Sequence, residues 1–369
     1  MWFIYVVLFL VFCWAVARFY LSGPNLAQYD QRLNVPLNHE RHASPAHSDV
    51  ITKLQDFGQG SGGPDKASRL NQMRAAMDSI GDSADLDGIT LIPVESASVK
   101  GEWVLGEHSD PDKRMLYIHG GAFMLGSPRS HRTITTKYAR LLGVSVFAVD
   151  YRMLPEHGRL DCLSDCQAAY RYVLDNGPTG AGAATQLLMS GDSAGGNLAL
   201  VVTAWARDHA LRMADGVIAI APATDNTFGS PTLRRNAATD PLLGPSLGKL
   251  VRLPRAALLY FSWFSTRLHP TDSRISPIHG NLHGLPPILI QASEAEMLLG
   301  DARRYANKAN AQGSTVKLET WNHMIHVWHV FEPELPEAKQ AFEHIAKFVQ
   351  NLPDPVNDSA SQQLQQAQN

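Results

Sequence analysis

A serine set among small residues is the side chain whose setting best fits nucleophilic chemistry. Ser193 lies at the centre of Gly191–Gly195, which reads Gly-Asp-Ser-Ala-Gly, follows the apolar run 187–190 and precedes the helix-like stretch 196–207. The glycines allow a sharp turn between strand and helix, where a Cβ atom would clash with both elements. Such a turn holds the serine hydroxyl above the sheet, and the helix N-terminus beneath it favours negative charge on a nearby oxygen. The motif therefore predicts a serine nucleophile.

A second glycine motif has the right composition to stabilise an anionic oxygen. His119, Gly120 and Gly121 follow the apolar stretch 115–118. Two consecutive glycines let backbone N–H groups approach a substrate oxygen closely. We expect the N–H groups of Gly120, Gly121 and Ala194 to form an oxyanion hole for a tetrahedral intermediate.

A serine nucleophile also needs a base to take its proton and an acid to orient that base. Both are expected after the serine in the chain, with the acid first. Carboxylates gather directly after the apolar run 288–292, and they are Glu294, Glu296 and Asp301. Because the first turn of a helix favours carboxylates anyway, position alone leaves the choice among them open.

Histidines follow the stretch 317–320, which we interpret as the last strand. They are His323, His326 and His329. Their spacing of three could suggest a metal-binding face, but no carboxylate or cysteine nearby completes a ligand set. We therefore expect no metal and no cofactor, and we place the base among these histidines.

Taken together, the motifs resemble those of the hormone-sensitive lipase family of α/β-hydrolases. The stretches that carry the resemblance are His-Gly-Gly-Ala at 119–122, Tyr-Arg-Met-Leu-Pro-Glu-His at 151–157 and Gly-Asp-Ser-Ala-Gly at 191–195. The resemblance covers roughly residues 86–350. It implies that Glu296, immediately before an apolar-Leu pair, is the acid and that His326 is the base. The implied activity is carboxylic ester hydrolysis through an acyl-enzyme.

The substrate is less constrained than the chemistry. A lactonase, an amidase or a deacetylase would use the same triad. A non-catalytic ligand-binding receptor on a hydrolase fold is an alternative of another class, but such a protein would usually lack the base, and His326 is present. The aromatic stretch 259–264 suggests that the substrate is a hydrophobic ester with a short to medium acyl chain.

Strand-like and helix-like segments alternate along the chain, and the motifs lie at the ends of the expected strands. Apolar runs recur at 115–118, 144–149, 187–190, 217–221 and 288–292, with helix-length segments mostly between them. This alternation predicts an α/β fold with a mostly parallel central sheet and helices on both faces. We expect the hydrolase domain at 86–350 with a helical cap inserted at about 224–275. Residues 22–85 are expected to form a linker and an N-terminal cap, and 351–369 a disordered tail.

An uncharged apolar run opens the chain. Residues 1–17 carry no charge, and Arg18 closes the run. At about 1.5 Å per residue the run reaches roughly 25 Å, and residues 19–21 extend it toward the thickness of a bilayer core. We favour a single-pass membrane anchor at 1–21. The alternative is a signal peptide, which would make the protein secreted or periplasmic, but the segment lacks a basic N-terminal region.

Composition limits the partners of the protein. The 369 residues are 44% hydrophobic and 18% charged, with a formal net charge of -3. Such a chain has the material for a large buried sheet and lacks the basic excess that nucleic acid requires, so we expect a small-molecule partner and no nucleic acid. The glycines of 58–63 fit a dinucleotide-binding pattern, but no convincing strand precedes them, and we interpret the segment as a loop.

Overall fold

The computed structural model of the chain describes residues 1–33, 36–37, 43–59 and 65–353. Most of the expected disordered tail lies outside these residues. So do residues 60–63 of the glycine-rich segment, while Gly58 ends up within a helix.

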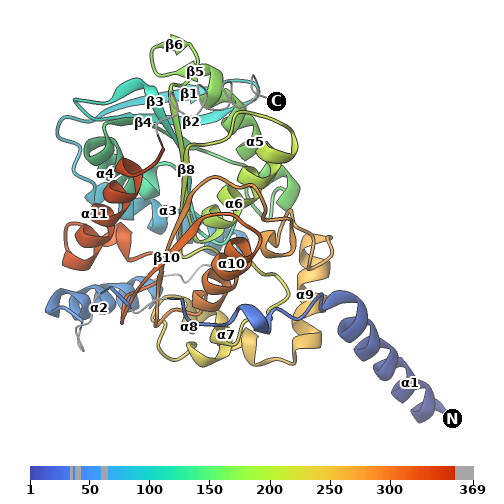
Figure 1. Cartoon of the computed structure of the whole chain (residues 1–369). Coiled ribbons are helices and arrows are strands. Elements are labelled where there is room, and N and C mark those ends of the chain that lie inside the picture. The colour runs from blue at the N-terminus through green and yellow to red at the C-terminus, as the bar shows by residue number, and fades with distance from the viewer. Residues whose placement is uncertain (34–35, 38–42, 60–64, 354–369) are drawn as a thin grey trace, which may run out of the picture.

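A single large sheet forms the centre of the molecule (Figure 1). Its eight strands lie in the order β1-β2-β4-β3-β7-β8-β9-β10. In chain order they are β1 (Thr90–Glu95), β2 (Lys100–Leu105), β3 (Asp110–Ile118), β4 (Val144–Val149), β7 (Gln186–Asp192), β8 (Gly216–Ile220), β9 (Ile288–Ser293) and β10 (Val316–Trp321). The pairs β1/β2 and β2/β4 are antiparallel, and the others are parallel. The mostly parallel sheet expected from the sequence is confirmed.

Helices cover both faces of this sheet. The α-helices of the described residues are α1 (Trp2–Ala15), α2 (Pro45–Gln59), α3 (Lys66–Ile80), α4 (Arg132–Leu142), α5 (Arg159–Asp175), α6 (Ser193–Asp208), α7 (Thr232–Arg235), α8 (Leu243–Leu247), α9 (Arg255–Thr266), α10 (Leu299–Ala311) and α11 (Pro336–Gln350). Helices α5, α6 and α10 pack on one face, and α4 and α11 on the other. A short hairpin, β5 (Asn176–Gly177) with β6 (Gly180–Ala181), lies apart from the sheet.

Alternation along β3 shows how the two faces are filled. Leu116 and Ile118 pack into a core with α5, α6 and α10, whereas Met115 and Tyr117 pack into a second core with α4 and α11. Successive side chains of a strand point to opposite faces, so a strand covered on both sides is apolar throughout. That is why the central strands read as continuous apolar runs in the sequence.

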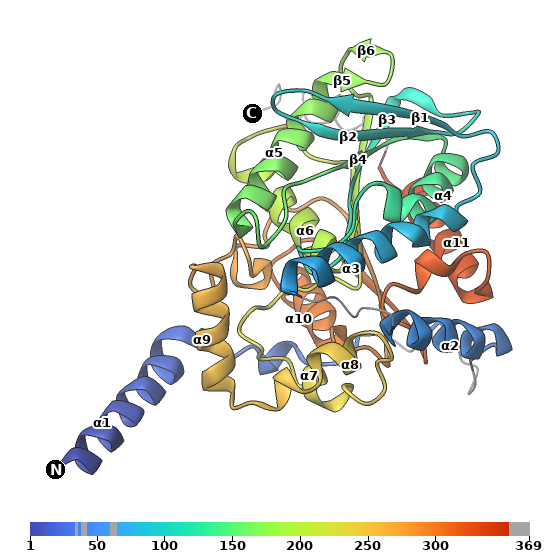
Figure 2. The same cartoon turned by 180° about the vertical axis from the view of Figure 1, so that it is seen from behind.

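The insertion between β8 and β9 contains three α-helices, α7, α8 and α9. Together with α2 it occupies the lower half of the molecule in both views, and α3 lies at the upper border of this half (Figures 1 and 2). This half lies beyond the carboxyl ends of the parallel strands, where ligands bind in open α/β sheets.

The first helix leaves the body of the molecule. Helix α1 continues through a π-helical turn, Val16–Leu21, and its N-terminal part projects outward beside α9 (Figures 1 and 2). The joined segment Trp2–Leu21 has 20 residues and a mean hydropathy of 2.2, and only 11% of its apolar window is buried. By length and composition it could be a membrane anchor or a signal sequence.

Candidate active site

Ser193 sits at the junction of β7 and α6 in a strained backbone conformation. Its φ is 52°, in the left-handed region that residues with a Cβ atom rarely adopt. A Cβ on Gly191 would lie 2.5 Å from the carbonyl oxygen of Gly195, and a Cβ on Gly195 would lie 2.0 Å from that of Ile118. Both glycines are therefore required by the close approach of β3, β7 and α6, which forces the serine into the turn.

A continuous hydrogen-bonded chain links three side chains from separate elements. Nε2 of His326 lies 2.9 Å from Oγ of Ser193, and Nδ1 of His326 lies 2.5 Å from Oε2 of Glu296. The second oxygen of Glu296 accepts the backbone N–H of Ser293 at 2.7 Å, so the carboxylate is fixed to the end of β9. Both Glu296 and His326 are buried.

Burial and the carboxylate act in opposite directions on His326. Burial alone would lower the pKa of His326, but the hydrogen bond and the negative charge of Glu296 outweigh it, and the pKa of His326 is raised above 6.5. The carboxylate thus makes the imidazole a stronger base than burial alone would leave it.

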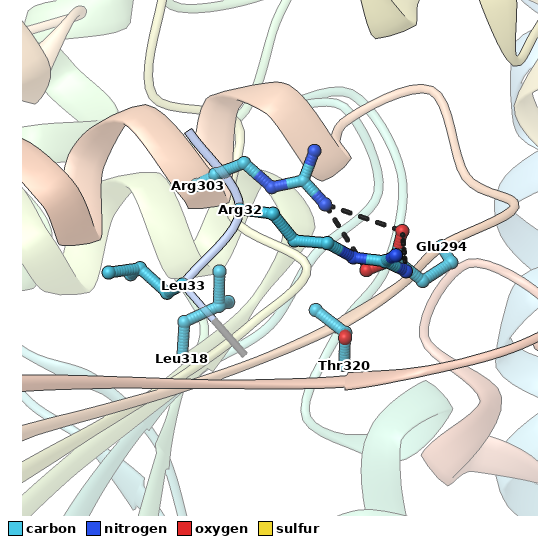
Figure 3. Close-up of a pocket in the computed structure, with 6 residues that line it drawn as sticks. All are labelled: Arg32, Leu33, Glu294, Arg303, Leu318 and Thr320. Carbon is cyan, nitrogen blue, oxygen red and sulfur yellow. Dashed lines mark hydrogen bonds and ion pairs between the residues drawn. The ribbon is translucent and has the colours of Figure 1, made fainter. Parts of the chain in front are cut away.

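The two other candidate acids have different partners. Glu294 lies between two guanidinium groups, 3.1 Å from Arg303 and 3.2 Å from Arg32, as Figure 3 shows. Asp301 accepts the backbone N–H groups of Thr224 and Asp225. Of the three carboxylates, the structure brings only Glu296 to His326.

One of the expected oxyanion donors is already occupied. The N–H of Gly120 donates to Oδ1 of Asp192 at 2.9 Å. A Cβ at Gly120 would lie 2.1 Å from the other oxygen of this carboxylate, so the glycine is needed for contact with Asp192. The sequence expectation gave Gly120 an oxyanion-hole N–H, and in this structure that N–H is taken up by Asp192. Gly121, with a φ of 107°, makes the next turn of the loop, and Ala194 lies in the first turn of α6, where backbone N–H groups have no acceptor within the helix.

Asp192 is buried and ionised beneath the oxyanion loop. Burial would raise its pKa, but the charge of His131 and the hydrogen bonds from His131 and Tyr117 lower the pKa to about 2. Oδ1 accepts the Tyr117 hydroxyl at 2.6 Å, and Oδ2 lies 3.4 Å from Nε2 of His131. The residue before the nucleophile thus ties the loop that begins at His119 to the end of β7.

Known proteins match this chain over most of its length. The sequence pattern of the alpha/beta hydrolase fold family matches residues 115–330. An acetyl-hydrolase of Streptomyces hygroscopicus is 35% identical over 249 residues, which cover 67% of this chain and 78% of the relative. An esterase of Acinetobacter venetianus is 32% identical over 264 residues, which cover 72% of this chain and 83% of that esterase.

A solved structure gives the same result. The crystal structure of an esterase from the bacterial hormone-sensitive lipase family superposes with a TM-score of 0.72 at 29% identity, over 84% of this chain and 99% of the esterase. The chain is an α/β-hydrolase of the hormone-sensitive lipase family.

This α/β-hydrolase is a carboxylic ester hydrolase, and its substrates are small-molecule esters. The resemblance seen in the sequence is confirmed. The matched residues 115–330 include the loop that begins at His119, the turn at Ser193, Glu296 and His326.

The two other candidate histidines of the hydrolase, His323 and His329, lie in different environments from His326. His329 is fully buried, its Nε2 lies 2.8 Å from the side-chain oxygen of Gln291, and burial lowers its pKa to about 3. His323 adopts a φ of 64° in the turn that leads to His326. Among the described residues no group of three or more potential metal ligands is found.

The sequence interpretation missed Asp192 as a functional residue of the α/β-hydrolase. It occupies the variable second place of the nucleophile motif, where any residue satisfies the pattern. One available signal was a charged residue at the end of a strand whose other residues are apolar, since a carboxylate buried there needs donors to satisfy it.

Proposed function

We propose that this hydrolase cleaves esters through a triad of Ser193, His326 and Glu296. The observation that carries the proposal is the unbroken chain of hydrogen bonds from the serine hydroxyl through the imidazole to the buried carboxylate. The order along the chain, Ser then Glu then His, is the order expected of an α/β-hydrolase.

Each triad member has one role in this mechanism. Nε2 of neutral His326 takes the proton of Ser193 as Oγ attacks the ester carbonyl carbon, while Glu296 accepts the Nδ1–H and stabilises the imidazolium. The tetrahedral intermediate collapses when the C–O bond breaks and the imidazolium gives its proton to the leaving alcohol. Water, deprotonated by the same histidine, then attacks the acyl-enzyme and releases the acid.

We assign the oxyanion hole to the N–H groups of Gly121 and Ala194. Gly121 follows the amide that Asp192 holds, and the dipole of α6 adds favourable potential at Ala194. Loss of one donor in such a hole typically costs about a hundredfold or more in turnover.

For the substrate we propose hydrophobic esters of short to medium chain length. Two segments that we interpret as caps, 22–85 and the insertion at about 224–275, would select the acyl and alcohol groups. The first of them contacts the turn that follows the oxyanion loop, because Arg74 of α3 donates to the carbonyl oxygens of Met124 and Leu154. A relative described as an acetyl-hydrolase supports a small acyl group.

We further propose that residues 1–21 anchor the enzyme to a membrane. The side chains of Trp2–Phe12 are almost all exposed, and they include large apolar residues on every side of α1. A helix that is apolar all round is stable when lipid surrounds it.

The test is hydrolysis of a series of p-nitrophenyl esters by the wild type and by Ser193→Ala. Activity that peaks at acetate to hexanoate and falls by at least about a thousandfold in the variant is expected. A lactone and an anilide measured in parallel separate esterase from lactonase and amidase. Wild-type inactivity toward every ester, or full turnover in Ser193→Ala, would overturn the assignment.

A further inference from the structure

The inner end of the N-terminal helix is packed onto helix α9. Ala17 and Leu21 are buried against Leu259 of α9. The hydroxyl of Tyr260 donates to the carbonyl oxygen of Cys13 at 2.8 Å. These contacts fix the direction in which the helix leaves the body, so it is not a flexible tether.

Two more polar contacts hold the junction between the N-terminal helix and α9. Arg255 at the start of α9 donates to the carbonyl oxygen of Ser22 at 3.1 Å. Nε2 of His269, just after α9, lies 2.9 Å from the carbonyl oxygen of Tyr20. The chain is thus held on both sides of the π-helical turn Val16–Leu21.

Helix α9 also carries a large exposed aromatic surface. Phe261 is 51% exposed and Phe264 is 70% exposed. The ring of Phe264 stacks on Trp263 with a centroid distance of 5.4 Å, and on Tyr260 at 6.1 Å. Figures 1 and 2 both show α9 directly beside the base of the projecting α1. We call Phe261 and Phe264 the α9 aromatic face.

The exposed part of the N-terminal helix is too short to span a bilayer core, and this bears on what the α9 aromatic face contacts. Trp2–Phe12 stands clear of the body and is about 17 Å long, whereas a bilayer core is about 30 Å thick. The whole segment Trp2–Leu21 has 20 residues and reaches about 30 Å. The helix can therefore span a bilayer only if the stretch that packs on α9 also enters it.

We propose that the α9 aromatic face and the N-terminal helix form one membrane-binding surface, with the aromatic face lying in the interfacial layer of a phospholipid bilayer. The inference rests on the proposed anchoring by residues 1–21. Aromatic rings are the side chains that favour this layer. Exposed Arg18 and Arg267, at the same junction, form no ion pair with any described residue and are free to meet lipid phosphates.

Two consequences follow for the enzyme. The proposal requires that residues 1–21 stay in the mature protein, because cleavage after Ala17 would remove contacts that bury Leu259 and satisfy Tyr260. The insertion between β8 and β9 faces the membrane, so a hydrophobic ester dissolved in lipid reaches the enzyme at the segment that we interpret as its cap.

The experiment measures the depth of a fluorescent label in the full chain reconstituted into vesicles. The vesicles contain phosphatidylcholine and phosphatidylglycerol that carry a doxyl nitroxide at a shallow or a deep position of an acyl chain, which quenches an NBD label at the interface or in the hydrocarbon core, respectively. Cys13→Ala removes the one partly exposed native thiol, since Cys162 and Cys166 are buried. Labels are placed at Phe9→Cys on α1, Ser265→Cys on α9 and Leu141→Cys on α4, which lies across the molecule from α1 (Figures 1 and 2).

Ser265 reports on the aromatic face without removing it. It is exposed and lies one turn after Phe261. We expect quenching at 9 and 265 and none at 141. Adding Phe261→Ser and Phe264→Ser should weaken quenching at 265 and leave it unchanged at 9, because the contacts with α1 still hold α9 near the bilayer. The double variant should keep the circular-dichroism spectrum and melting temperature of the wild type, because Phe261 and Phe264 are 51% and 70% exposed.

The possible failures are distinguishable. Quenching at 9 but not at 265 would overturn the membrane position of α9 and leave the anchor standing. Quenching at neither position, with the protein absent from floated vesicles, would overturn the anchor itself. An unquenched label at 265 that crosslinks to a second copy of the chain would assign the face to self-association instead.

Discussion

The backbone N–H of Gly120 donates to the carboxylate of Asp192, and through this contact the residue before the nucleophile holds the oxyanion loop. Two strands, β3 and β7, run side by side in the sheet and end at this bond. The loop and the serine are therefore positioned by the same buried charge.

Substitution of Asp192 should disable the enzyme without touching the triad. Asp192→Ala leaves Gly120 N–H and the Tyr117 hydroxyl without their acceptor, so the loop can shift away from the substrate oxygen. We expect kcat/KM for p-nitrophenyl acetate to fall about 100- to 1000-fold, the scale of losing an oxyanion donor. Stability should fall by about 1–3 kcal/mol, measured by urea unfolding. Asp192→Asn keeps an acceptor oxygen and should retain more activity, and equal loss in both variants would contradict the positioning role.

The acid limb of the pH profile should report on Glu296. His326 must be neutral to accept the serine proton, and its raised pKa moves the loss of activity at low pH to values above pH 6.5. In Glu296→Gln the largest raising influence on the pKa of His326 is gone, and burial then outweighs the weaker effects of Asp240 and Asp192, so the limb should move to lower pH. Maximal kcat should also fall, by about 1000- to 10,000-fold, because the imidazole loses its orienting partner.

Glu294→Gln is the matched control for that experiment. It removes a neighbouring carboxylate that pairs with Arg303 and Arg32 instead of His326. Its pH limb and kcat should match those of the wild type. A shift in the Glu294 variant, or an unmoved limb in Glu296→Gln, would show that the acid is misassigned.

Asp301 should make the folded state less stable as the pH rises. Burial and the charge of Asp225 raise the pKa of Asp301 to about 8, while Arg304 lowers it only in part. A carboxyl that binds its proton more tightly when folded stabilises the fold fully below its unfolded pKa, and that stability is lost as the pH rises toward 8. The free energy of unfolding in urea should therefore decrease from pH 5 to pH 9.

Asp301→Asn should flatten this decrease. The amide oxygen can still accept the N–H groups of Thr224 and Asp225, and the side chain no longer titrates. Asp208→Asn, at a side chain that is 58% exposed, makes the same charge change on the surface and should leave the pH dependence as in the wild type. Parallel curves for wild type and Asp301→Asn would count against a buried proton at this position.

The parts of the structure that the sequence predicted are those with local signals. Consecutive small residues between a strand and a helix predicted the turn at Ser193, and continuous apolar runs predicted the central strands. The start of β3 was not predicted, because Asp110–Lys113 is polar, although it pairs within the sheet. The start of β3 is a strand because β4 and β7 pair with it, and such pairing cannot be predicted from hydrophobicity alone.

Contacts between distant residues escaped prediction for a physical reason. Gly120 and Asp192 are 72 positions apart, and Cys13 and Tyr260 are 247 positions apart. Which N–H group a carboxylate takes depends on where two strands end in space. The two consecutive glycines predicted the loop. The sequence could not show that the Gly120 N–H donates to Asp192, which leaves the Gly121 N–H for the substrate oxygen in our assignment.

The left-handed backbone of Ser193, our proposed nucleophile, lowers the stability of the folded state. Replacement by glycine removes the oxygen and relieves the torsion together, because glycine adopts this φ without steric cost. Ser193→Gly should then melt no lower than the wild type, whereas Ser193→Ala, which keeps the Cβ, should melt below the glycine variant. The enzyme would thus have a lower free energy of unfolding than its glycine variant as a consequence of keeping the catalytic hydroxyl.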